Sequence, residues 1–250
     1  MPDFFGQTKL VLIPKVPNPL MEKDFRPISC CSVIYKCIAK LLTSRLKMVL
    51  PRLIQPTQVA FVKERKILFN VLIFQDIAWG YSRKGISPRC IMKIDLHKAF
   101  DSVHWPFIKE LLHHLKFLDQ FVKWIMACIT SISFSIHVNG QQGRTFQGRR
   151  GLKQGDPLSP LLFFLTIEYF SRMMKLARLH PDFYFHPSPK KLSLNHLMFA
   201  DDVLLFCKAH PLTVQLIMQV LKDFYCCSGL QANHSKSVVV FGGCSMALQS

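Results

Sequence analysis

The stretch Leu197-Met198-Phe199-Ala200-Asp201-Asp202-Val203-Leu204-Leu205 decides how this chain folds. Apolar residues stand on both sides of the two aspartates, which is the pattern of two buried strands joined by a short turn. An Asp-Asp pair on its own more often marks an ordinary turn, because aspartate suits turn positions. Here the apolar flanks put two charges at the tip of a buried hairpin, where they need a ligand or a counter-ion.

A second acidic residue ends a strand-like run about a hundred residues earlier, in Met92-Lys93-Ile94-Asp95-Leu96. A single acid in this position is most often a helix cap or a salt-bridge partner. Carboxylates about 4 Å apart repel by roughly 1 kcal/mol in water and by about 4 kcal/mol at an effective dielectric of 20. Divalent cations offset this repulsion, and paired Mg²⁺ ions bridged by aspartates are the usual agents of nucleotidyl transfer. The sequence therefore predicts a metal site if Asp95 converges with Asp201 and Asp202.

The composition is that of a globular, strongly basic chain. Half of its 250 residues are hydrophobic, and 32 Lys and Arg against 15 Asp and Glu give a formal net charge of +17. This excess favours a polyanionic partner, with nucleic acid ahead of a membrane surface. No apolar run reaches the roughly 18 residues of a membrane span, and the N-terminus lacks a secretory pattern. We expect no transmembrane segment and no signal peptide, and a nuclear or cytoplasmic location.

The nine cysteines include no Cys-x-x-Cys pair. The adjacent pairs Cys30-Cys31 and Cys226-Cys227 have poor geometry for a disulfide or a zinc site. We therefore expect reduced core cysteines and no zinc.

Hydrophobic periodicity predicts helices mixed with an antiparallel hairpin, which favours an α+β fold over a doubly wound parallel sheet. In the first helix we expect Pro51 to end the helix, and we expect one apolar stripe to be buried, made of Ile34, Cys37, Ile38, Leu41, Leu42, Leu46 and Val49. Residues 14–30 read as a loop because prolines follow the first strand. The expected helices cover residues 33–50, 66–80, 103–117, 119–130, 159–177 and 211–228, and the expected strands cover 10–13, 90–96, 134–138, 192–199, 203–207 and 238–241.

A glycine-punctuated loop, Gly151–Pro160, leads into one of these helices. Glycines let a backbone approach a ligand closely, and Gln154 offers a donor and an acceptor beside a helix N-terminus, where a phosphate is favoured. A simple loop-to-helix junction is the alternative interpretation. Phe100, five residues after Asp95, either fills core or forms the floor of a sugar pocket, and its position alone does not separate the two.

In their order along the chain, these segments resemble the motifs of non-LTR (LINE-type) retrotransposon reverse transcriptases. Ile94–Val103 is similar to motif A, Gly151–Pro160 to motif B, Phe199–Asp202 to motif C, and Gly229–Ser237 to motif D. Asp24–Ser29, Tyr35–Lys40 and Gln58–Val62 resemble segments of the fingers. The resemblance covers residues 9–243 and is closest to plant LINE elements.

The resemblance implies an α+β right-hand polymerase fold with a palm and fingers and with the thumb largely missing. It assigns residues 1–90 to partial fingers, with further fingers elements within residues 104–150. Residues 91–243 then form the palm that carries motifs A to D, and residues 244–250 form a tail.

The implied activity is that of an RNA-directed DNA polymerase, a nucleotidyltransferase that adds dNTPs to a primer 3′ end by a two-metal mechanism. Asp95, Asp201 and Asp202 would be catalytic and would hold two Mg²⁺ ions, with Mn²⁺ as an alternative. The implied dNTP-binding residues are Phe100, as the steric gate against a ribose 2′-hydroxyl, Gln154, Gly155, Arg26, Lys36 and Lys236. For Arg26 and Lys36, an ordinary solvated basic face is the competing interpretation.

The implied partners are an RNA template, a DNA primer and dNTPs. No membrane is expected, and the sequence indicates no stable protein partner. Where the family usually has Pro-Gly-Arg, this chain has Lys63-Glu64-Arg65, and it ends soon after motif D with no endonuclease domain or zinc knuckle. We therefore interpret it as a fragment of a retrotransposon protein. The alternative is a catalytically inactive nucleic-acid-binding remnant.

Overall fold

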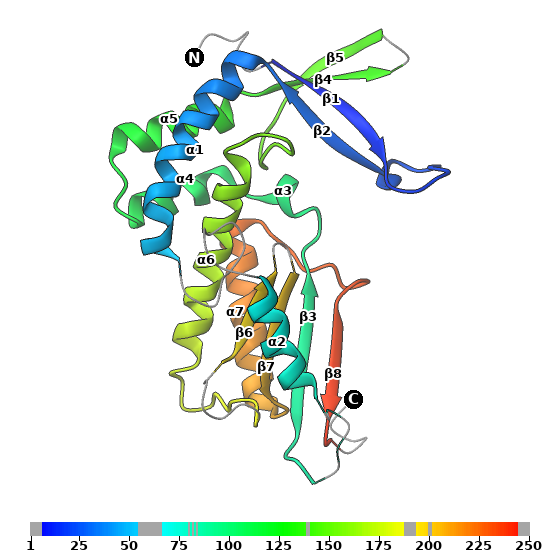
Figure 1. Cartoon of the computed structure of the whole chain (residues 1–250), viewed down its shortest axis with the longest axis vertical. Helices are drawn as coiled ribbons and strands as arrows, with labels where there is room; N and C mark the ends of the chain where they lie inside the picture. Colours follow the sequence, from blue (N-terminus) through cyan, green and yellow to red (C-terminus); the bar gives the residue numbers. More distant parts are fainter. Residues whose placement is uncertain are drawn as a thin grey trace. The chain divides into compact units, whose positions relative to one another are not determined.

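The computed structural model describes residues 7–54, 67–79, 81, 83, 85–138, 141–187, 194–199 and 202–244. The chain divides into two compact units, which are described separately (Figure 1). Unit 1 contains Met1–Leu50 and Phe100–Phe164, and unit 2 contains Pro51–Ala99 and Leu165–Ser250. In the described part of the chain, no helix is long and apolar enough to cross a membrane.

Unit 1 contains a four-stranded sheet in the order β2-β1-β4-β5. Its strands are β1 (Gln7–Pro14), β2 (Phe25–Cys31), β4 (Ser133–Val138) and β5 (Gln141–Gln147). β1 pairs antiparallel with β2 and parallel with β4, and β4 pairs antiparallel with β5. Residues 139–140, between β4 and β5, lie outside the described residues.

The prediction of a loop over residues 14–30 was wrong in its last part, where β2 forms after a 3-10 turn (η2, Glu22–Asp24). Pro27 lies within β2, and a proline cannot donate a ladder hydrogen bond. β2 is the edge strand of its sheet, so one side of its backbone has no partner strand in the sheet. An edge position tolerates the proline that made this segment look like a loop.

The first helix, α1 (Val33–Leu53), forms as predicted, but of the predicted buried stripe only Leu42 and Leu46 are buried. Its buried side chains are Tyr35, Ala39, Leu42, Thr43, Leu46 and Leu50. Ile34 and Leu41 are 54% and 57% exposed. Two apolar stripes run along this helix, and periodicity alone does not say which of them faces the core. The predicted stop at Pro51 was also early, because the proline lies in the last turn of the helix.

The helix predicted over residues 103–117 is shorter in the structure, as α4 (Trp105–His114), and a separate short helix, α3 (Ala99–Ser102), precedes it. The N-cap of α4 is His104, and Pro106 lies in its first turn. Proline suits that turn, where its missing N–H would have no partner within the helix. α5 (Asp119–Thr130) follows with the predicted bounds.

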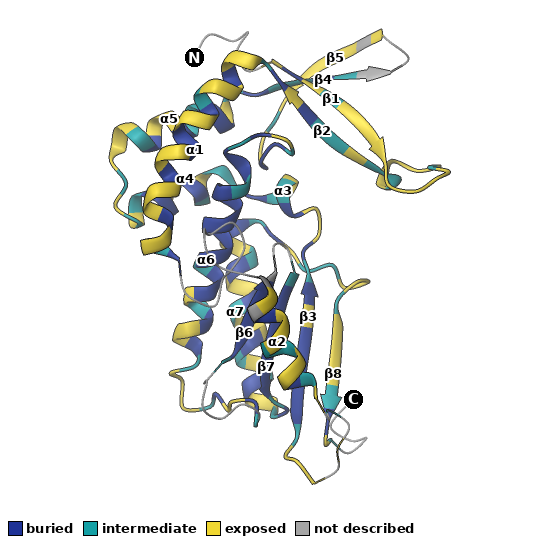
Figure 2. Cartoon of the chain, viewed as in Figure 1, coloured by how far each residue is buried: buried dark blue, intermediate teal, exposed yellow. Residues whose placement is uncertain are grey.

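Unit 2 contains an antiparallel sheet in the order β6-β7-β3-β8. The strands are β3 (Arg89–Asp95), β6 (His196–Phe199), β7 (Asp202–Lys208) and β8 (Val238–Gly242). The pairing of β6 with β7 confirms the predicted hairpin arms. Figure 2 shows β3, β6 and β7 as largely buried and β8 as more exposed.

Helices cover both faces of the unit 2 sheet. On one face, α2 (Ile67–Ala78) packs Ile77 against Ile91, Leu204 and Phe206. α7 (Pro211–Ser228) also contacts β7, and its Phe224 packs on Phe170 of α6 (Ser159–Ala177), with ring centroids 5.0 Å apart. Because alternate residues of a strand face opposite sides, β3 and β7 need apolar residues throughout. This explains why β7 is a continuous hydrophobic run from Val203 to Cys207 and why β3 is apolar between its ends except at Lys93.

A buried polar network links β6 to α6. The Nδ1–H of His196 donates to Asn195 Oδ1 (2.7 Å), its Nε2 accepts from the Ser171 hydroxyl (2.6 Å), and the Asn195 amide donates to the Met174 carbonyl (2.7 Å). With a neutral imidazole, both ring nitrogens of His196 have a hydrogen-bond partner in this network. Burial lowers the pKa of His196 to about 4, because the charged form loses its hydration.

We predict that burial of His196 lowers the stability of the fold at acidic pH. The folded-state pKa is below the unfolded value of about 6.5, so the unfolded chain binds the extra proton. Stability is therefore complete above about pH 6.5 and falls as the pH drops towards 4, by roughly 2 kcal/mol at pH 5. Urea unfolding at pH 7.5 and pH 5 measures this loss. In His196→Gln the loss should shrink by about that amount, and an unchanged pH dependence would contradict the assignment.

Candidate active site

Two of the predicted catalytic carboxylates lie on neighbouring strands of unit 2. Asp95 ends β3, Asp202 begins β7, and the antiparallel register pairs these residues directly. Opposed residues of such a pair project to the same face of the sheet, with Cβ atoms about 4.5–5.5 Å apart. The structure thus brings Asp95 and Asp202 together at one end of the sheet. Asp201 lies outside the described residues, so its position stays a prediction.

Asn233 and Ser237, in the segment that precedes β8, hold Asp95 through hydrogen bonds. Asn233 donates its backbone N–H to the Asp95 carbonyl (2.7 Å) and its side-chain amide to Asp95 Oδ2 (3.1 Å). The backbone N–H of Asp95 donates in turn to the Ser237 hydroxyl (3.2 Å). These three hydrogen bonds fix both the backbone and the carboxylate of Asp95. The chain can reach this position because Gly229 ends α7 in the left-handed conformation (φ 80°).

Asp202 has a different partner, the side chain of Lys93. The Lys93 Nζ lies 3.3 Å from Asp202 Oδ1, with the two side chains 49% and 36% exposed. Lys93 is two residues before Asp95 and therefore on the same face of β3. Within the described ranges, Asp95 thus has a neutral partner, Asn233, and Asp202 has a cationic partner, Lys93.

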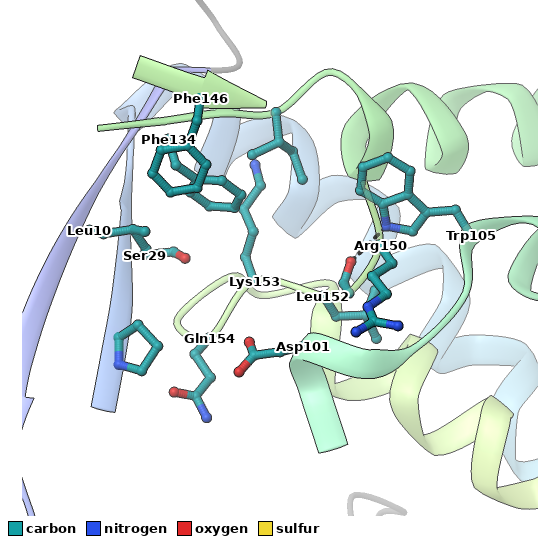
Figure 3. A pocket seen from close by; sticks show the side chains of 13 residues that line it. Leu10, Ser29, Asp101, Trp105, Phe134, Phe146, Arg150, Leu152, Lys153 and Gln154 are labelled. Atoms are coloured by element: carbon teal, nitrogen blue, oxygen red, sulfur yellow. Dashed lines mark hydrogen bonds between the residues drawn. The ribbon is translucent and has the colours of Figure 1, made fainter. Parts of the chain in front are cut away.

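Unit 1 holds the glycine-punctuated loop against the residues that follow Asp95 in the chain. Gly151 donates to the Val103 carbonyl (2.8 Å) and Leu152 to the Phe100 carbonyl (2.6 Å). The indole N–H of Trp105 donates to the Gly151 carbonyl (2.7 Å), the bond that is dashed in Figure 3. The parts of unit 1 that resemble motifs A and B are therefore joined through backbone hydrogen bonds.

Three predicted substrate residues lie in or beside this loop. The Gln154 carbonyl accepts from the Ser29 N–H (2.8 Å), which ties the loop to β2. Gly155 has φ +99°, and a Cβ there would come within 3.2 Å of the Ser29 carbonyl oxygen. The Phe100 ring stacks on Phe163 at 4.8 Å and is only partly buried. Phe100 is thus braced by core on one side while part of it stays accessible.

The loop also contains a buried lysine that sequence reasoning assigned no role. The Lys153 Nζ lies 3.5 Å from the centre of the Tyr35 ring, and no residue in the described ranges accepts a hydrogen bond from it. Burial lowers the pKa of Lys153 and raises the pKa of Asp156, while the opposite charges of the two groups work against both shifts. Asp156 also accepts from the N–H and hydroxyl of Ser159, at 3.2 and 3.0 Å, at the start of α6.

The three predicted phosphate contacts are all exposed basic side chains. Arg26 lies on β2 and Lys36 in the first turns of α1, both in unit 1. Lys236 lies in unit 2, in the turn before β8, where its backbone N–H donates to the Asn233 carbonyl (3.1 Å). Lys236 therefore belongs to the same turn that holds Asp95. The geometry of Arg26 and Lys36 fits a solvated basic face as well as a phosphate contact.

A small cavity of about 140 Å³ lies between the loop and the sheet of unit 1. Figure 3 shows Phe134 and Phe146 on one side of it and Gln154 with Asp101 on another. Buried within the fold, Gln154 Oε1 has no hydrogen-bond partner among the residues that the structure describes. The cavity is smaller than the roughly 300–1,000 Å³ of most ligand pockets, and we assign it no ligand.

Two contacts at the acid pair were missed by sequence reasoning. Lys93 read only as an interruption of an apolar strand, and Asn233 only as part of motif D. Their roles depend on which residues the strands bring opposite each other, and only the pairing register supplies that information. The described residues contain no group of three or more His, Cys, Asp or Glu side chains that could hold a metal. They do contain two of the three predicted carboxylate ligands.

We predict that Gly151→Ala destabilises unit 1. Gly151 has φ +89°, and a Cβ there would lie 2.7 Å from the Asp101 carbonyl oxygen. Left-handed strain and a backbone clash together should cost more than about 2 kcal/mol. Gly85→Ala is the matched control, because Gly85 has φ +87° with open space around its Cβ position and should lose only about 1 kcal/mol. Thermal unfolding of both variants tests this, and equal losses would show that the clash is relieved.

The sequence matches the reverse transcriptase (RNA-dependent DNA polymerase) family over residues 13–245. It is 30% identical over 233 residues to the transposon TX1 uncharacterized 149 kDa protein of Xenopus laevis, which covers 91% of this chain and 17% of that protein. It is 29% identical over 240 residues to the retrovirus-related Pol polyprotein from type-2 retrotransposable element R2DM of Drosophila melanogaster, covering 96% and 22%. The chain therefore spans about a fifth of the length of these relatives.

The fold is similar to that of telomerase from Candida tropicalis in complex with a TWJ fragment of telomeric RNA. The TM-score is 0.62 at 13% identity, covering 95% of this chain and 41% of that chain. This likeness confirms the predicted α+β right-hand polymerase fold. The family match and the retrotransposon relatives together show that the chain belongs to the reverse transcriptase family, as a reverse transcriptase domain of the non-LTR retrotransposon type.

Proposed function

We propose that this chain is the RNA-directed DNA polymerase domain of a longer retrotransposon protein and adds dNTPs to the 3′ end of a primer. The observation that carries the proposal is the direct cross-strand pairing of Asp95 with Asp202 in a chain of the reverse transcriptase family. Two carboxylates on one face at the end of a sheet suit a reaction in which phosphate charge must be neutralised.

The proposed metal ligands are Asp95, Asp201 and Asp202. The donors fit the cation, because carboxylate oxygens are the ligands that Mg²⁺ prefers, and Mn²⁺ accepts the same set. Bound there, two Mg²⁺ ions would lower the pKa of the primer 3′-hydroxyl and neutralise charge on the triphosphate. Asn233 keeps the Asp95 carboxylate in one orientation through its amide hydrogen bond. The position of Asp201 within this set rests on the motif resemblance.

The proposed nucleotide contacts are those that the motif resemblance implies. Phe100 would reject a ribose 2′-hydroxyl, and the support from the fold is that Phe163 braces its ring. Gln154 and Gly155 would border the incoming dNTP and the template, where the absence of a side chain at Gly155 leaves backbone accessible. Arg26, Lys36 and Lys236 would contact phosphates. That these residues contact one and the same dNTP is implied by the motifs to which they belong.

The proposed partners are an RNA template and a DNA primer. The net charge of +17 supports them, because phosphate contacts dominate such binding and make it weaken steeply with salt. We also propose, from the sequences of the motifs, that the chain comes from a plant LINE element. The assignment of residues 1–90 to fingers and 91–243 to the palm, with a tail after them, is part of the same proposal.

A second candidate function is binding of nucleic acid without catalysis. The observation that favours it is the strong basic excess, which supports binding of a polyanion whether or not the acid pair is catalytic. An inactive remnant would keep salt-sensitive RNA binding and lose metal-dependent synthesis. The two candidates therefore differ in one measurable property, synthesis by the unmodified chain.

We predict that the chain extends a DNA primer on an RNA template with Mg²⁺ and that Asp95→Asn slows this extension more than a hundredfold. The amide keeps the shape of the side chain but removes the charge that holds the cation, and ligand losses of this kind exceed the roughly 10–100-fold cost of losing an outer partner. Single-nucleotide extension at saturating dNTP measures the rate.

Asp119→Asn is the matched control for this experiment. Asp119 is an 81% exposed carboxylate on α5 that pairs with His113, so its loss should leave the rate unchanged. Extension by Asp95→Asn at the unmodified rate would rule out the proposed mechanism. RNA binding without synthesis by the unmodified chain would favour the second candidate.

We predict that Phe100→Val lowers the preference for dNTPs over rNTPs by about tenfold or more. The smaller side chain removes the bulk against which a 2′-hydroxyl would clash. The ratio of kcat/KM for dNTP and rNTP incorporation measures the preference. Phe146→Val is the control, because Phe146 is an exposed aromatic of β5 in the same unit. An unchanged ratio in Phe100→Val would leave Phe100 as core only.

A further inference from the structure

We propose that Lys93 is a built-in counter-ion of Asp202, which occupies this carboxylate until a divalent cation takes its place and thereby weakens cation binding. The inference rests on the proposed function, because it requires that the acid pair holds divalent cations. It adds a residue that tunes the site and that the proposed mechanism does not use.

The position of Lys93 follows from the register of β3 and β7. Lys93 pairs with Leu204, and Asp95 pairs with Asp202, so Lys93 and Asp202 are diagonal neighbours on one face of the sheet. Diagonal neighbours lie within reach of a long side chain. The lysine uses that reach, since its Nζ lies 3.3 Å from Asp202 Oδ1.

The neighbours of Lys93 in the sheet are apolar, and its charged partner is a member of the acid pair. Its cross-strand partner Leu204 and its same-face neighbour Ile91 belong to the buried cluster under α2. On its other side, Lys93 pairs with Val238 of β8. The Lys93 side chain therefore leaves the strand among apolar residues, and its ammonium group forms an ion pair with the carboxylate of Asp202. A lysine side chain in this arrangement covers apolar residues with its methylene stem and keeps its ammonium group in polar surroundings.

The two carboxylates are consequently unequal. Asp95 accepts a hydrogen bond from the neutral Asn233 amide, which leaves its negative charge uncompensated by that partner. Asp202 shares its charge with a cation. A divalent ion that binds Asp202 must displace the ammonium group from that carboxylate. The presence of Lys93 therefore costs binding affinity.

The size of the effect follows from simple electrostatics. Opposite unit charges 3.3 Å apart attract strongly enough, at the dielectric of water, that displacing the lysine costs an incoming ion roughly tenfold in affinity. Lys93 is half exposed and can move into solvent, so screening reduces the effect. We expect a three- to tenfold change, roughly, on removal of the charge.

The test measures Mn²⁺ binding to the full chain without nucleic acid or dNTP, from the electron paramagnetic resonance signal of the free ion. Lys93→Met removes the charge and keeps the stem, and it should bind Mn²⁺ about three- to tenfold more tightly. Lys93→Arg keeps the charge and should bind like the unmodified chain. Circular dichroism confirms that each variant is folded.

A double variant separates the proposed route from a general effect of charge. In an Asp202→Asn background the ammonium group has no carboxylate to occupy, so adding Lys93→Met should change Mn²⁺ affinity by less than twofold. Equal tightening in both backgrounds, or none in Lys93→Met alone, would overturn the proposal. If the unmodified chain binds no Mn²⁺, or if Asp95→Asn binds it equally well, the proposed function itself fails. Binding that needs Asp95 but ignores Lys93 removes only the counter-ion role.

Discussion

The antiparallel register between β3 and β7 is the constraint on which the rest of unit 2 depends. It places Asp95 opposite Asp202 and, at the same time, Ile91 opposite Phe206 under α2. A slip of one residue would turn every side chain of a strand to the other face. The apolar residues on both faces therefore protect the acid pair, because a slipped register would move charged side chains into the core.

Backbone hydrogen bonds carry the corresponding constraint in unit 1. The loop that contains Gln154 is bonded to Phe100, Val103 and Ser29 through main-chain atoms. Main-chain bonds of this kind do not depend on side-chain identity, but they require glycine where the chains approach most closely. Gly151 and Gly155 meet that need with positive φ angles and with no Cβ to strike a neighbouring carbonyl. The buried Lys153 then braces the loop against α1 through the ring of Tyr35.

Much of the fold could be predicted from sequence where one pattern dominated. The bounds of α5 and α7 and the pairing of β6 with β7 were predicted because their periodicity or turn residues admit one interpretation. β2 was missed because an edge strand tolerates proline, and the buried face of α1 was predicted only in part because two apolar stripes compete. Within the site, the pairing of Asp95 with Asp202 depended on convergence that the sequence could only suggest. Lys93 and Asn233 could not be predicted as partners, since register decides them.

The place of β3 within its sheet has a consequence for motion. This strand is paired on both sides, by β7 and β8, and helices cover its sheet on both faces. Its amide hydrogens can exchange with solvent only when a large part of unit 2 opens. Asp95 ends this slowly exchanging strand, and its own N–H is bonded to Ser237. Thermal fluctuation should therefore displace this carboxylate less than it displaces the exposed valines of β8, so the chain spends little time with its first acid out of position.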